Sequence, residues 1–422
     1  MIIKAFQNLY KKETLPKKTK KVIIPIFDTL TIIKDTNPED LEHPYVEQED
    51  LKKSLRFLKS YKGSQGTFNA YRRELERLLQ WCGLISNKPL KELKREDIQE
   101  FIQFCQKPPN SWIGTKKVSR FIVQQEERIP NPEWKPFVVS ISKSSYRKGN
   151  RPKYKDFEFS QVSIKETFAI LGSFYNYLIQ EDYVFMNPVA LIRQKSQFIR
   201  KQQGPTRIRR LSDLQWKYVI NTAKEMAEVK PDKHQRTLFI LNALYSMYLR
   251  ISELAANDRW CPQMKHFHRD NDRNWWFTTV GKGNKQRQIA VSDSMLEALK
   301  LWRKHLNLPP TPSPADNTPL LPKTKGKGPI KDTTYIRRIV QQCFDKAIEN
   351  LEKDKLYEEA TSLTEATVHW LRHTGISEDV KHRPKEHVRD DAGHSSSAIT
   401  DKYIDIELKE RHRSAKNKII PD

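Results

Sequence analysis

The sequence TVHWLRHTGIS, residues 367–377, is the stretch on which the fold prediction depends. His369 and Arg372 stand at i and i+3, so in a helix both side chains project from the same side. A metal site at this spacing would call for a pair such as HExxH with its carboxylate. Here the intervening residues are Trp and Leu, and Arg372 would repel a cation. The pattern therefore disfavours a metal centre.

Two segments upstream also combine basic residues with a predicted change of structure. In LYSMYLRISELAAN (244–257), Arg250 stands at the start of a predicted helix and Glu253 follows one turn later. In VGKGNKQR (280–287), a Gly-rich turn joins two predicted strands, but it lacks the spacing and the following Ser or Thr of a phosphate-binding P-loop. Taken singly, these segments read as a surface arginine and a polar hairpin turn.

The fourth segment lies downstream and supplies the order that makes the set recognisable. In AGHSSSAITDKYID (392–405), His394 precedes Tyr403 by nine positions. Together the four segments resemble the catalytic domain of tyrosine recombinases (phage integrases), whose pattern is LRxSEL, GKGxKxR, HxxRH and GHxxxxxxxxY. The resemblance covers most of residues 50–410, and its specificity lies in these four segments.

The resemblance implies a catalytic set of six residues: Arg250, Lys282, His369, Arg372, His394 and Tyr403. Tyr403 is the expected nucleophile. Arg250 and Arg372 would bind the phosphate oxygens. His369 is the candidate base, and His394 would hydrogen-bond the phosphate.

Two more residues complete the implied roles. Lys282 matches the general acid that protonates the departing 5′ oxygen, and Lys285 is its nearest rival. Glu253 would orient catalytic side chains.

The proposed reaction explains why these residue types occur together. Attack on a phosphodiester builds negative charge on the non-bridging oxygens, and planar guanidinium groups can bond two oxygens each. A phenol ionises only near pH ~10, so the nucleophile needs a proton acceptor and a cationic surround. The product would be a 3′-phosphotyrosyl DNA that reseals without ATP, metal or other cofactor.

Some residues depart from the family pattern. Lys282 follows Arg250 by 32 positions, which is longer than the usual connection, and Asp390 and Asp391 stand where apolar residues are expected before the GH pair. After HxxRH, Gly375 interrupts the expected apolar run, as does the pair 378–379 (Glu-Asp). These departures leave local packing open, but each catalytic position is occupied.

Composition agrees with a polyanionic partner. The 422 residues carry a formal charge of +24, with 76 Lys and Arg against 52 Asp and Glu. A chain this basic repels itself unless it meets a polyanion, and nucleic acid is favoured over an acidic membrane because no long apolar run is present. Basic content alone would also fit an RNA-binding protein.

The termini and cysteines bear on the compartment. The start of the chain lacks the apolar segment of a signal peptide. The four cysteines, Cys82, Cys105, Cys261 and Cys343, are widely spaced and indicate reduced thiols in a cytosolic protein. We therefore expect a cytoplasmic, nucleoid-associated protein.

We predict a mainly α protein with a small β-sheet or hairpin in its catalytic domain. A basic N-terminal arm, 1–48, precedes a helical (SAM-like) core-binding domain, 49–192, with a basic, aromatic-rich insertion at 107–159. The arm could contact DNA or be a solvated tail, and the insertion could be a nucleic-acid surface or could pack on its domain. Residues 193–210 form a linker, and residues 211–422 form an α+β catalytic domain with a C-terminal tail.

The linker carries seven basic residues and no acid, which favours contact with the DNA backbone. Its candidate DNA-binding residues are Arg200, Lys201, Arg207, Arg209 and Arg210. With this linker along the duplex, the two domains would close as a clamp on DNA.

The sequence thus predicts a site-specific recombinase or integrase of a mobile element. We expect it to act on duplex DNA as a homo-oligomer, a tetramer on DNA, with DNA-bending accessory proteins as further partners and no membrane. The alternatives are a type IB topoisomerase-like nicking-closing enzyme, or a DNA-binding regulator with a relict active site.

Overall fold

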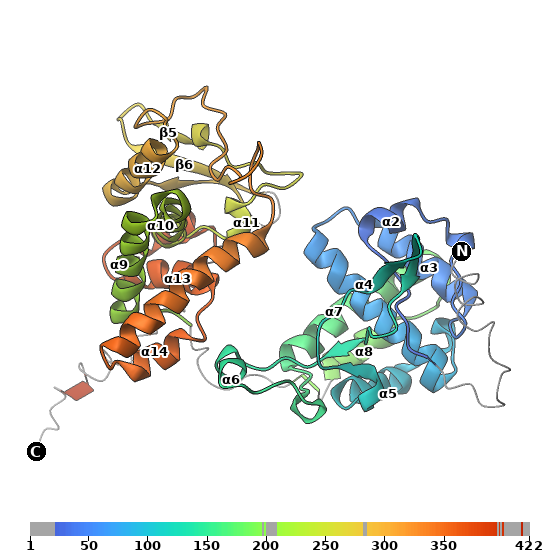
Figure 1. Ribbon diagram of the computed structural model, residues 1–422. Helices are drawn as coiled ribbons and strands as arrows, with labels where there is room; N and C mark the ends of the chain where they lie inside the picture. Colours follow the sequence, from blue (N-terminus) through green and yellow to red (C-terminus); the bar gives the residue numbers. More distant parts are fainter. Residues whose placement is uncertain are drawn as a thin grey trace, which may run out of the picture. The chain divides into compact units, whose positions relative to one another are not determined.

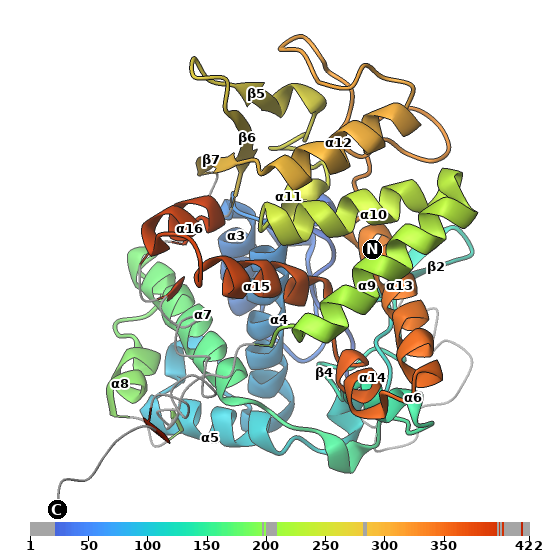
Figure 2. The same cartoon turned by 90° about the vertical axis from the view of Figure 1, so that its left-hand side faces the viewer.

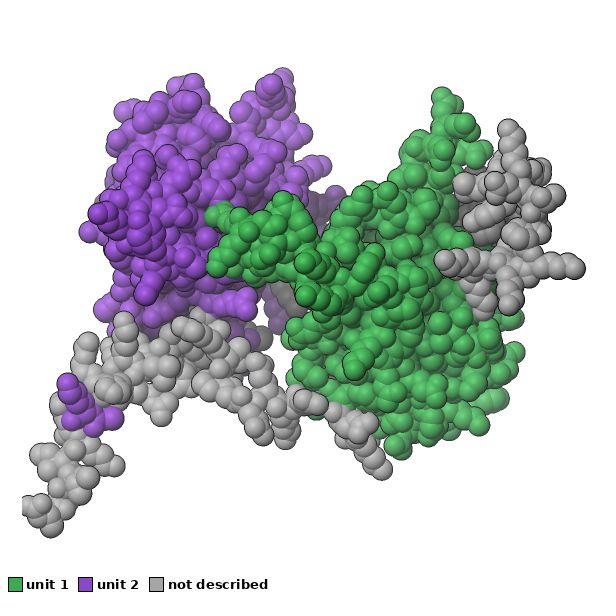
Figure 3. Space-filling model, turned by 60° about the horizontal axis from the view of Figure 1, so that its bottom comes forward, with its two compact units in different colours: residues 1–203 green, residues 204–422 purple. Residues whose placement is uncertain are grey.

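The computed structural model describes residues 22–195, 198–199, 209–281, 285–394, 396, 399–400 and 415–416, without side-chain detail for 193–195. The chain divides into two compact units, residues 1–203 and 204–422 (Figure 3). Each unit has its own hydrophobic core. Five predicted functional residues lie outside the described residues: Arg200, Lys201, Arg207, Lys282 and Tyr403.

The first unit is helical (Figure 1). Its helices are α2 (Leu30–Asp35), α3 (Gln48–Ser60), α4 (Gln65–Trp81), α5 (Arg95–Gln106), α6 (Lys143–Arg147), α7 (Gln161–Gln180) and α8 (Pro188–Lys195). Its short strands pair as β1 (Ile113–Gly114) with β4 (Phe137–Val138) and as β2 (Phe121–Gln124) with β3 (Glu127–Pro130).

Apolar residues recur at helical spacing in the sequence of α4 and of α5, which predicts one apolar face on each helix, and the structure confirms both faces. Phe68, Leu75 and Leu78 of α4 are fully buried, as are Ile98 and Phe101 of α5. Ser64 is the N-cap of α4, and its hydroxyl accepts a hydrogen bond from the Thr67 backbone at 3.2 Å. The 3.6-residue period therefore predicted both the presence and the buried side of these helices.

At three places the local sequence predicts structure that does not form: one or two strands in the apolar stretch from Val22, a capping box of Ser163 and Glu166 before the helix, and the end of that helix at Pro188. The apolar stretch from Val22 forms no strand, because residues 22–29 are irregular and α2 follows. The N-cap of α7 is Ser160, which accepts from the Ser163 backbone at 3.2 Å, so the predicted capping box of Ser163 and Glu166 lies inside the helix. Pro188 begins α8, where its missing N–H is harmless, and α7 has already ended at Gln180.

The residues around Ile26 belong to the core of the first unit. Their backbone is held by the buried Glu76 carboxylate, which accepts from the Ile26 and Phe27 amides and pairs with Arg120. The Arg120 guanidinium in turn lies 4.7 Å from the ring of Trp134. This part of the predicted arm is therefore anchored to the 107–159 insertion.

The aromatic residues of the insertion divide into two groups. Trp112 and Trp134 are buried in the core of the first unit, whereas Tyr146 and Tyr154 are exposed. The two tryptophans therefore pack on the domain, and the two tyrosines form part of its surface.

The second unit is α+β. Its helices are α9 (Asp213–Val229), α10 (Pro231–Ser246), α11 (Ile251–Leu254), α12 (Asp293–His305), α13 (Thr333–Lys353), α14 (Tyr357–Leu363), α15 (Val368–Asp379) and α16 (Lys385–Ala392). An antiparallel sheet joins β5 (Phe267–Arg269), β6 (Trp275–Val280) and β7 (Gln286–Ala290) in that order.

Sequence signals located several of these elements correctly. The predicted hairpin is β6–β7, with Val280 paired to Gln286. The capping box of Ser212 and Gln215 is present at the start of α9, where the Ser212 hydroxyl accepts from the Gln215 backbone at 3.1 Å. The apolar face of α13, including Ile336 and Phe344, is buried.

Helix α10 lies at the centre of the second unit and packs against α9, α12, α13 and α15. Figure 2 shows α11, α15 and α16 near the left-hand end of α10, with β7 beside α16. The described residues of the four motifs lie on or next to these elements.

The four cysteines are free thiols. Cys82, Cys105 and Cys343 are buried, whereas Cys261 is exposed. Burial raises the pKa of the Cys343 thiol to about 12. No helix in the described ranges has the length and apolar character needed to span a bilayer.

Candidate active site

Arg250 stands at the N-terminus of α11. The preceding turn places Tyr248 in the left-handed region, with φ of 47°, and its side chain is fully buried. The Glu253 carboxylate accepts from the Arg250 backbone at 2.7 Å and from its guanidinium Nη1 at 3.1 Å. The predicted link between Arg250 and Glu253 is thus a short-range cap that fixes the start of this arginine's side chain.

A second arginine binds the same carboxylate from the β-sheet. Arg287 of β7 donates through Nη1 and Nη2 to the two oxygens of Glu253, at 2.6 and 2.9 Å. Its Nε donates to the Asp391 carbonyl at the end of α16, at 2.9 Å. The Arg287 guanidinium therefore joins the GKGxKxR segment to the LRxSEL segment and to the end of α16, just before the segment that contains His394.

Arg372 is the most deeply buried arginine of the site, with 3% of its surface exposed. It projects from α15 and donates to the backbone carbonyls of Tyr248 and Ala392, the latter at 2.5 Å. Because these carbonyls precede Arg250 and His394 respectively, Arg372 fixes the backbone on both sides of the site.

Gly375 explains how α15 reaches this position. A Cβ at residue 375 would lie 2.1 Å from the Tyr245 carbonyl oxygen at the end of α10. Only glycine permits so close an approach of the two helices. The break in the apolar pattern that the sequence showed here is therefore a packing requirement of Arg372's helix.

Two further glycines bring backbone against Arg287. A Cβ at Gly281 would lie 2.9 Å from Arg287 Nη1 and 3.6 Å from Arg250 Nη1. Gly393 has a φ of 62°, and a Cβ there would lie 2.8 Å from Arg287 Cδ. The residue before Lys282 is thus packed against the arginine pair, and the residue before His394 is packed against Arg287.

Three histidines lie in the electrostatic field of these arginines. Burial, followed by the charges of Arg372 and Arg250, lowers the pKa of His394 to about 4. Burial and the same two arginines also lower the pKa of His369. At neutral pH both imidazoles are uncharged, so each has one nitrogen able to accept a proton or a hydrogen bond.

The third histidine is His373, the last residue of HxxRH. Its ring centroid lies 5.0 Å from that of His369 in an edge-on arrangement. Burial, followed by the charges of His369 and Arg372, lowers its pKa to about 4. His394 is held separately, with Nδ1 2.9 Å from the Thr400 hydroxyl.

The unexpected acidic residues have structural partners. Asp391 is buried and accepts from Arg383 at 2.6 Å and from the Ala290 backbone at 3.2 Å, which attaches α16 to β7. Asp379 accepts from the Tyr248 hydroxyl and from Arg383. Exposed Asp390 pairs with the neighbouring Arg389.

The structure brings Arg250, His369, Arg372 and His394 together. Arg209 is exposed and Arg210 half-buried just before α9, and neither is part of this group. Sequence reasoning missed the roles of Arg287 and His373. Both stood in the quoted motifs, as the final residues of GKGxKxR and HxxRH, and that position was the available signal.

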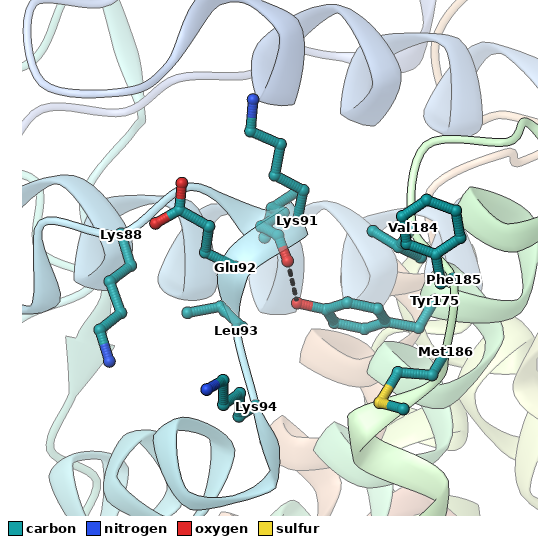
Figure 4. A pocket seen from close by; sticks show the side chains of 10 residues that line it. Lys88, Lys91, Glu92, Leu93, Lys94, Tyr175, Val184, Phe185 and Met186 are labelled. Carbon is teal, nitrogen blue, oxygen red and sulfur yellow. Dashed lines mark hydrogen bonds between the residues drawn. The ribbon is translucent and has the colours of Figure 1, made fainter.

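A separate pocket lies in the first unit and contains none of the predicted catalytic residues. Three lysines and the side chains of Phe185 and Met186 line it, and the Tyr175 hydroxyl donates to the Leu90 carbonyl at 3.2 Å (Figure 4). Phe185 and Met186 are both exposed.

The second unit thus presents clustered arginines and uncharged histidines beside a β-hairpin. Residues 209–410 match the model of the phage integrase family, the family of the tyrosine recombinases, and the chain carries that family's domain. The resemblance drawn from the four motifs is confirmed, as is the mainly helical fold class with a small sheet in this unit.

Individual relatives are distant. A tyrosine recombinase XerC of Chlorobaculum parvum is 25% identical over 146 residues, which are 33% of this chain and 41% of that protein. A tyrosine recombinase XerC of Thermodesulfovibrio yellowstonii is 27% identical over 261 residues, 59% of this chain and 73% of that protein. The chain therefore spans less than half of the first relative and nearly three quarters of the second.

A solved structure shows a similar fold. The XerH site-specific recombinase, in a post-cleavage complex with a palindromic difH substrate, has a TM-score of 0.53 at 14% identity. The similarity covers 92% of this chain and 94% of that chain.

Proposed function

We propose that this chain is a site-specific DNA recombinase that cleaves and rejoins duplex DNA through Tyr403. The observation that carries the proposal is the convergence of Arg250 and Arg372 with His369 and His394 in a family domain. Their electrostatic coupling implies a common cationic site that suits one phosphate group.

Each group has a defined part in the proposed step. The Tyr403 phenol oxygen attacks phosphorus, the bond from phosphorus to the 5′ oxygen breaks, and a 3′-phosphotyrosyl bond forms. His369 accepts the phenol proton, and Lys282 donates a proton to the departing 5′ oxygen. Reversal of these transfers by a 5′-hydroxyl reseals the strand, because the phosphotyrosyl bond conserves the phosphodiester.

The arginines stabilise the negative charge of the scissile phosphate. The scissile phosphate gains negative charge as the phenol adds, and a buried guanidinium stabilises that charge more than it stabilises the ground state. Arg372 is held by two carbonyls, so its guanidinium is oriented before the substrate arrives. His394 adds a hydrogen bond to the same phosphate.

The substrate and assembly follow from this chemistry. We expect duplex DNA bound by two copies at each recombination site and a tetramer when two sites pair. XerH was solved with a palindromic DNA, which supports a symmetric pair of copies here. Arg209 and Arg210, with the rest of the 193–210 segment, would follow the DNA backbone as the two domains clamp the duplex. DNA-bending proteins would assist.

The family also suggests the biological setting. Its name, phage integrase, supports integration or excision of a mobile element, and a DNA substrate implies action at the nucleoid. Recovery of recombinant junctions from cells carrying the gene beside its flanking DNA would test this setting. Junctions that never form would refute it.

The central test is covalent capture. Nicked duplexes with a randomised core are incubated with the protein, and adducts resistant to denaturant are isolated. We expect adducts with the wild type and none with Tyr403→Phe, while both proteins bind the selected duplex equally. Equal adduct yields from the two proteins would refute the role of Tyr403.

The same duplex distinguishes the main alternative. A recombinase produces joint products only when two copies of the selected site are present. A nicking-closing enzyme relaxes supercoiled plasmids that carry no such pair. Relaxation without joint products would favour the topoisomerase-like alternative, and absence of any wild-type adduct would favour a DNA-binding regulator.

A further inference from the structure

Arg287 joins the start of α11 to the end of α16, but no role was assigned to it from its motif. It binds both oxygens of Glu253, donates to the Asp391 carbonyl and packs against Gly281 and Gly393. Its side chain is 11% exposed, compared with 27% for Arg250. We propose that Arg287 is a positioning residue that neutralises Glu253 and so leaves the Arg250 guanidinium available to an anion.

The charge balance supports this role. Glu253 is almost completely buried, with 1% of its side chain exposed, and its carboxylate accepts from both arginines. Burial alone would raise the pKa of this carboxyl, but the hydrogen bonds and charge of Arg287 and Arg250 hold the pKa below its usual range. Glu253 is therefore ionised, and it carries one negative charge against two positive ones.

Removal of Arg287 would change how the Arg250 guanidinium bonds Glu253. With Arg287 present, the three groups sum to one positive charge, and Arg250 gives Glu253 a single side-chain hydrogen bond. Without it, the buried carboxylate would have only Arg250 as an ionic partner among the described residues. An uncompensated buried charge is costly, so the Arg250 guanidinium would turn fully to Glu253 and form a neutral pair.

The geometry also sets the direction of Arg250. The two shortest bonds to the carboxylate, other than the backbone cap, come from Arg287 at 2.6 and 2.9 Å, and Arg250 Nη1 stands farther away at 3.1 Å. The other N–H groups of Arg250 form no hydrogen bond with the described residues. They are the groups that a phosphate oxygen would meet.

The inference rests on the proposed function for its biological meaning, but it can be tested without it. The probe is inorganic sulfate, which resembles a phosphate in shape and charge. Sulfate affinity is read from the NMR shift of the His394 imidazole in Arg287→Gln, Arg287→Lys and the double variant Arg287→Gln with Glu253→Gln. We expect Arg287→Gln to weaken sulfate binding on the order of 10-fold.

The double variant separates charge balance from mere support of the fold. Removing the Glu253 charge as well frees Arg250 again, so sulfate affinity should return to within about three-fold of the wild type. Arg287→Lys keeps the charge and should bind sulfate better than Arg287→Gln. Unchanged affinity in Arg287→Gln, or no recovery in the double variant, would overturn the inference.

A matched control comes from another buried arginine of the same unit. Arg303 is 2% exposed and pairs with Asp316 at 2.7 Å, and its other acceptors are the carbonyls of Pro309 and Thr311, none of which belongs to the site. Arg303→Gln should lower the melting temperature but leave sulfate affinity unchanged. Loss of sulfate affinity in this control would mean that general destabilisation explains the Arg287 result.

A chemical readout then connects the inference to the reaction. On a selected duplex, Arg287→Gln should form the covalent adduct on the order of 100-fold more slowly than the wild type. A neutral methylphosphonate at the scissile position removes much of the need for Arg250, so the deficit should shrink to below about 10-fold. An equal deficit on both substrates would contradict the proposed link through Arg250. A wild type that binds sulfate through Arg250 but forms no adduct would refute the proposed function alone.

Discussion

The two units use the same ion pair in opposite ways. In the first, Glu74 and Arg77 stand three residues apart with Arg73 as a second cation; in the second, Arg250 and Glu253 have the same spacing with Arg287 as the second cation. Both carboxylates are buried. The difference lies in whether the guanidinium still has N–H donors without a partner after it has bonded the carboxylate.

Arg77 is fully used by the protein. Its guanidinium bonds both oxygens of Glu74 and the Pro136 carbonyl, and it stacks 4.4 Å from the Phe137 ring. Arg250 gives its side chain to one oxygen only and stays more exposed. An ion pair therefore indicates an anion-binding site only when its cation keeps N–H donors that the protein does not use. The presence of an ion pair alone does not indicate such a site.

The largest expected effect is on the reaction rate and concerns the clustered arginines of the second unit. Arg372→Ala should slow covalent adduct formation on the order of 1,000-fold, because a preoriented donor to the transition state is lost. Single-turnover trapping on the selected duplex measures the rate, and DNA affinity is measured in parallel. A rate within a few-fold of the wild type, with the variant folded, would place the cationic site elsewhere.

For the ion pair of the first unit we predict the reverse: a loss of stability without a loss of activity. Arg77→Met should lower the free energy of unfolding by about 3 kcal/mol, since buried Glu74 loses the partner that bonds both of its oxygens. Urea denaturation measures the loss. Well below its melting temperature, the same variant should form the DNA adduct at the wild-type rate. A slow adduct despite a folded protein would show that the two ion pairs are not opposites.

A third test concerns the packing that carries Arg372. Gly375→Ala should lower the free energy of unfolding by about 2 to 3 kcal/mol, because the new methyl group would overlap the Tyr245 carbonyl and push α15 from α10. Calorimetry measures the effect. Gly149→Ala is the control: that glycine has open space around it, although its φ of 87° adds a small strain of its own. Equal effects of the two changes would remove the close approach as the cause.

Acidification should weaken the second unit. The folded pKa of His373 and of His394 is about 4, below the ordinary value of 6.5. The unfolded chain therefore takes up protons first as pH falls, so the stabilisation is complete above about pH 6.5 and is lost towards pH 4. From pH 7 to 5.5 we expect a loss of about 1 kcal/mol from His373 and a smaller loss from the less buried His394, measured by urea denaturation. His373→Gln should remove the part of this pH-dependent loss that His373 causes. An unchanged pH dependence in this variant would contradict the lowered pKa of His373.

The smallest expected effect is a difference between the two units in how a histidine responds to sulfate. Burial alone lowers the pKa of His43 in the first unit to about 4, whereas arginines contribute to that of His394. Inorganic sulfate should therefore raise the pKa of His394 by roughly one unit and leave His43 unchanged. NMR titration of both imidazoles measures this. Equal shifts would show that sulfate acts on the whole protein and not at the arginines.

Local patterns predicted much of the fold. Apolar periodicity located α4, α5 and α13, and alternation around a Gly-rich turn located the β6–β7 hairpin. Both signals are contained in a few consecutive residues. The N-cap of α7 was misplaced by three residues because Ser160 and Ser163 both fit a cap, and only the backbone conformation distinguishes them.

The site was predictable as a set of residues but not as a network. Motif order supplied Arg250, His369, Arg372 and His394, while nothing local shows that Arg287 reaches Glu253 across 34 positions. The close approach at Gly375 is equally long-range. Tertiary packing decides such contacts, and a single sequence does not display it.

The unequal accessibility of the four thiols offers a practical handle. Cys261 lies outside the core, between α11 and β5, while the other three are buried with raised pKa values. A maleimide dye should therefore label the native protein once, in the second unit, without engineering. The three hidden thiols become reactive only on opening, so they report unfolding of the core of each unit separately: Cys82 and Cys105 for the first, Cys343 for the second.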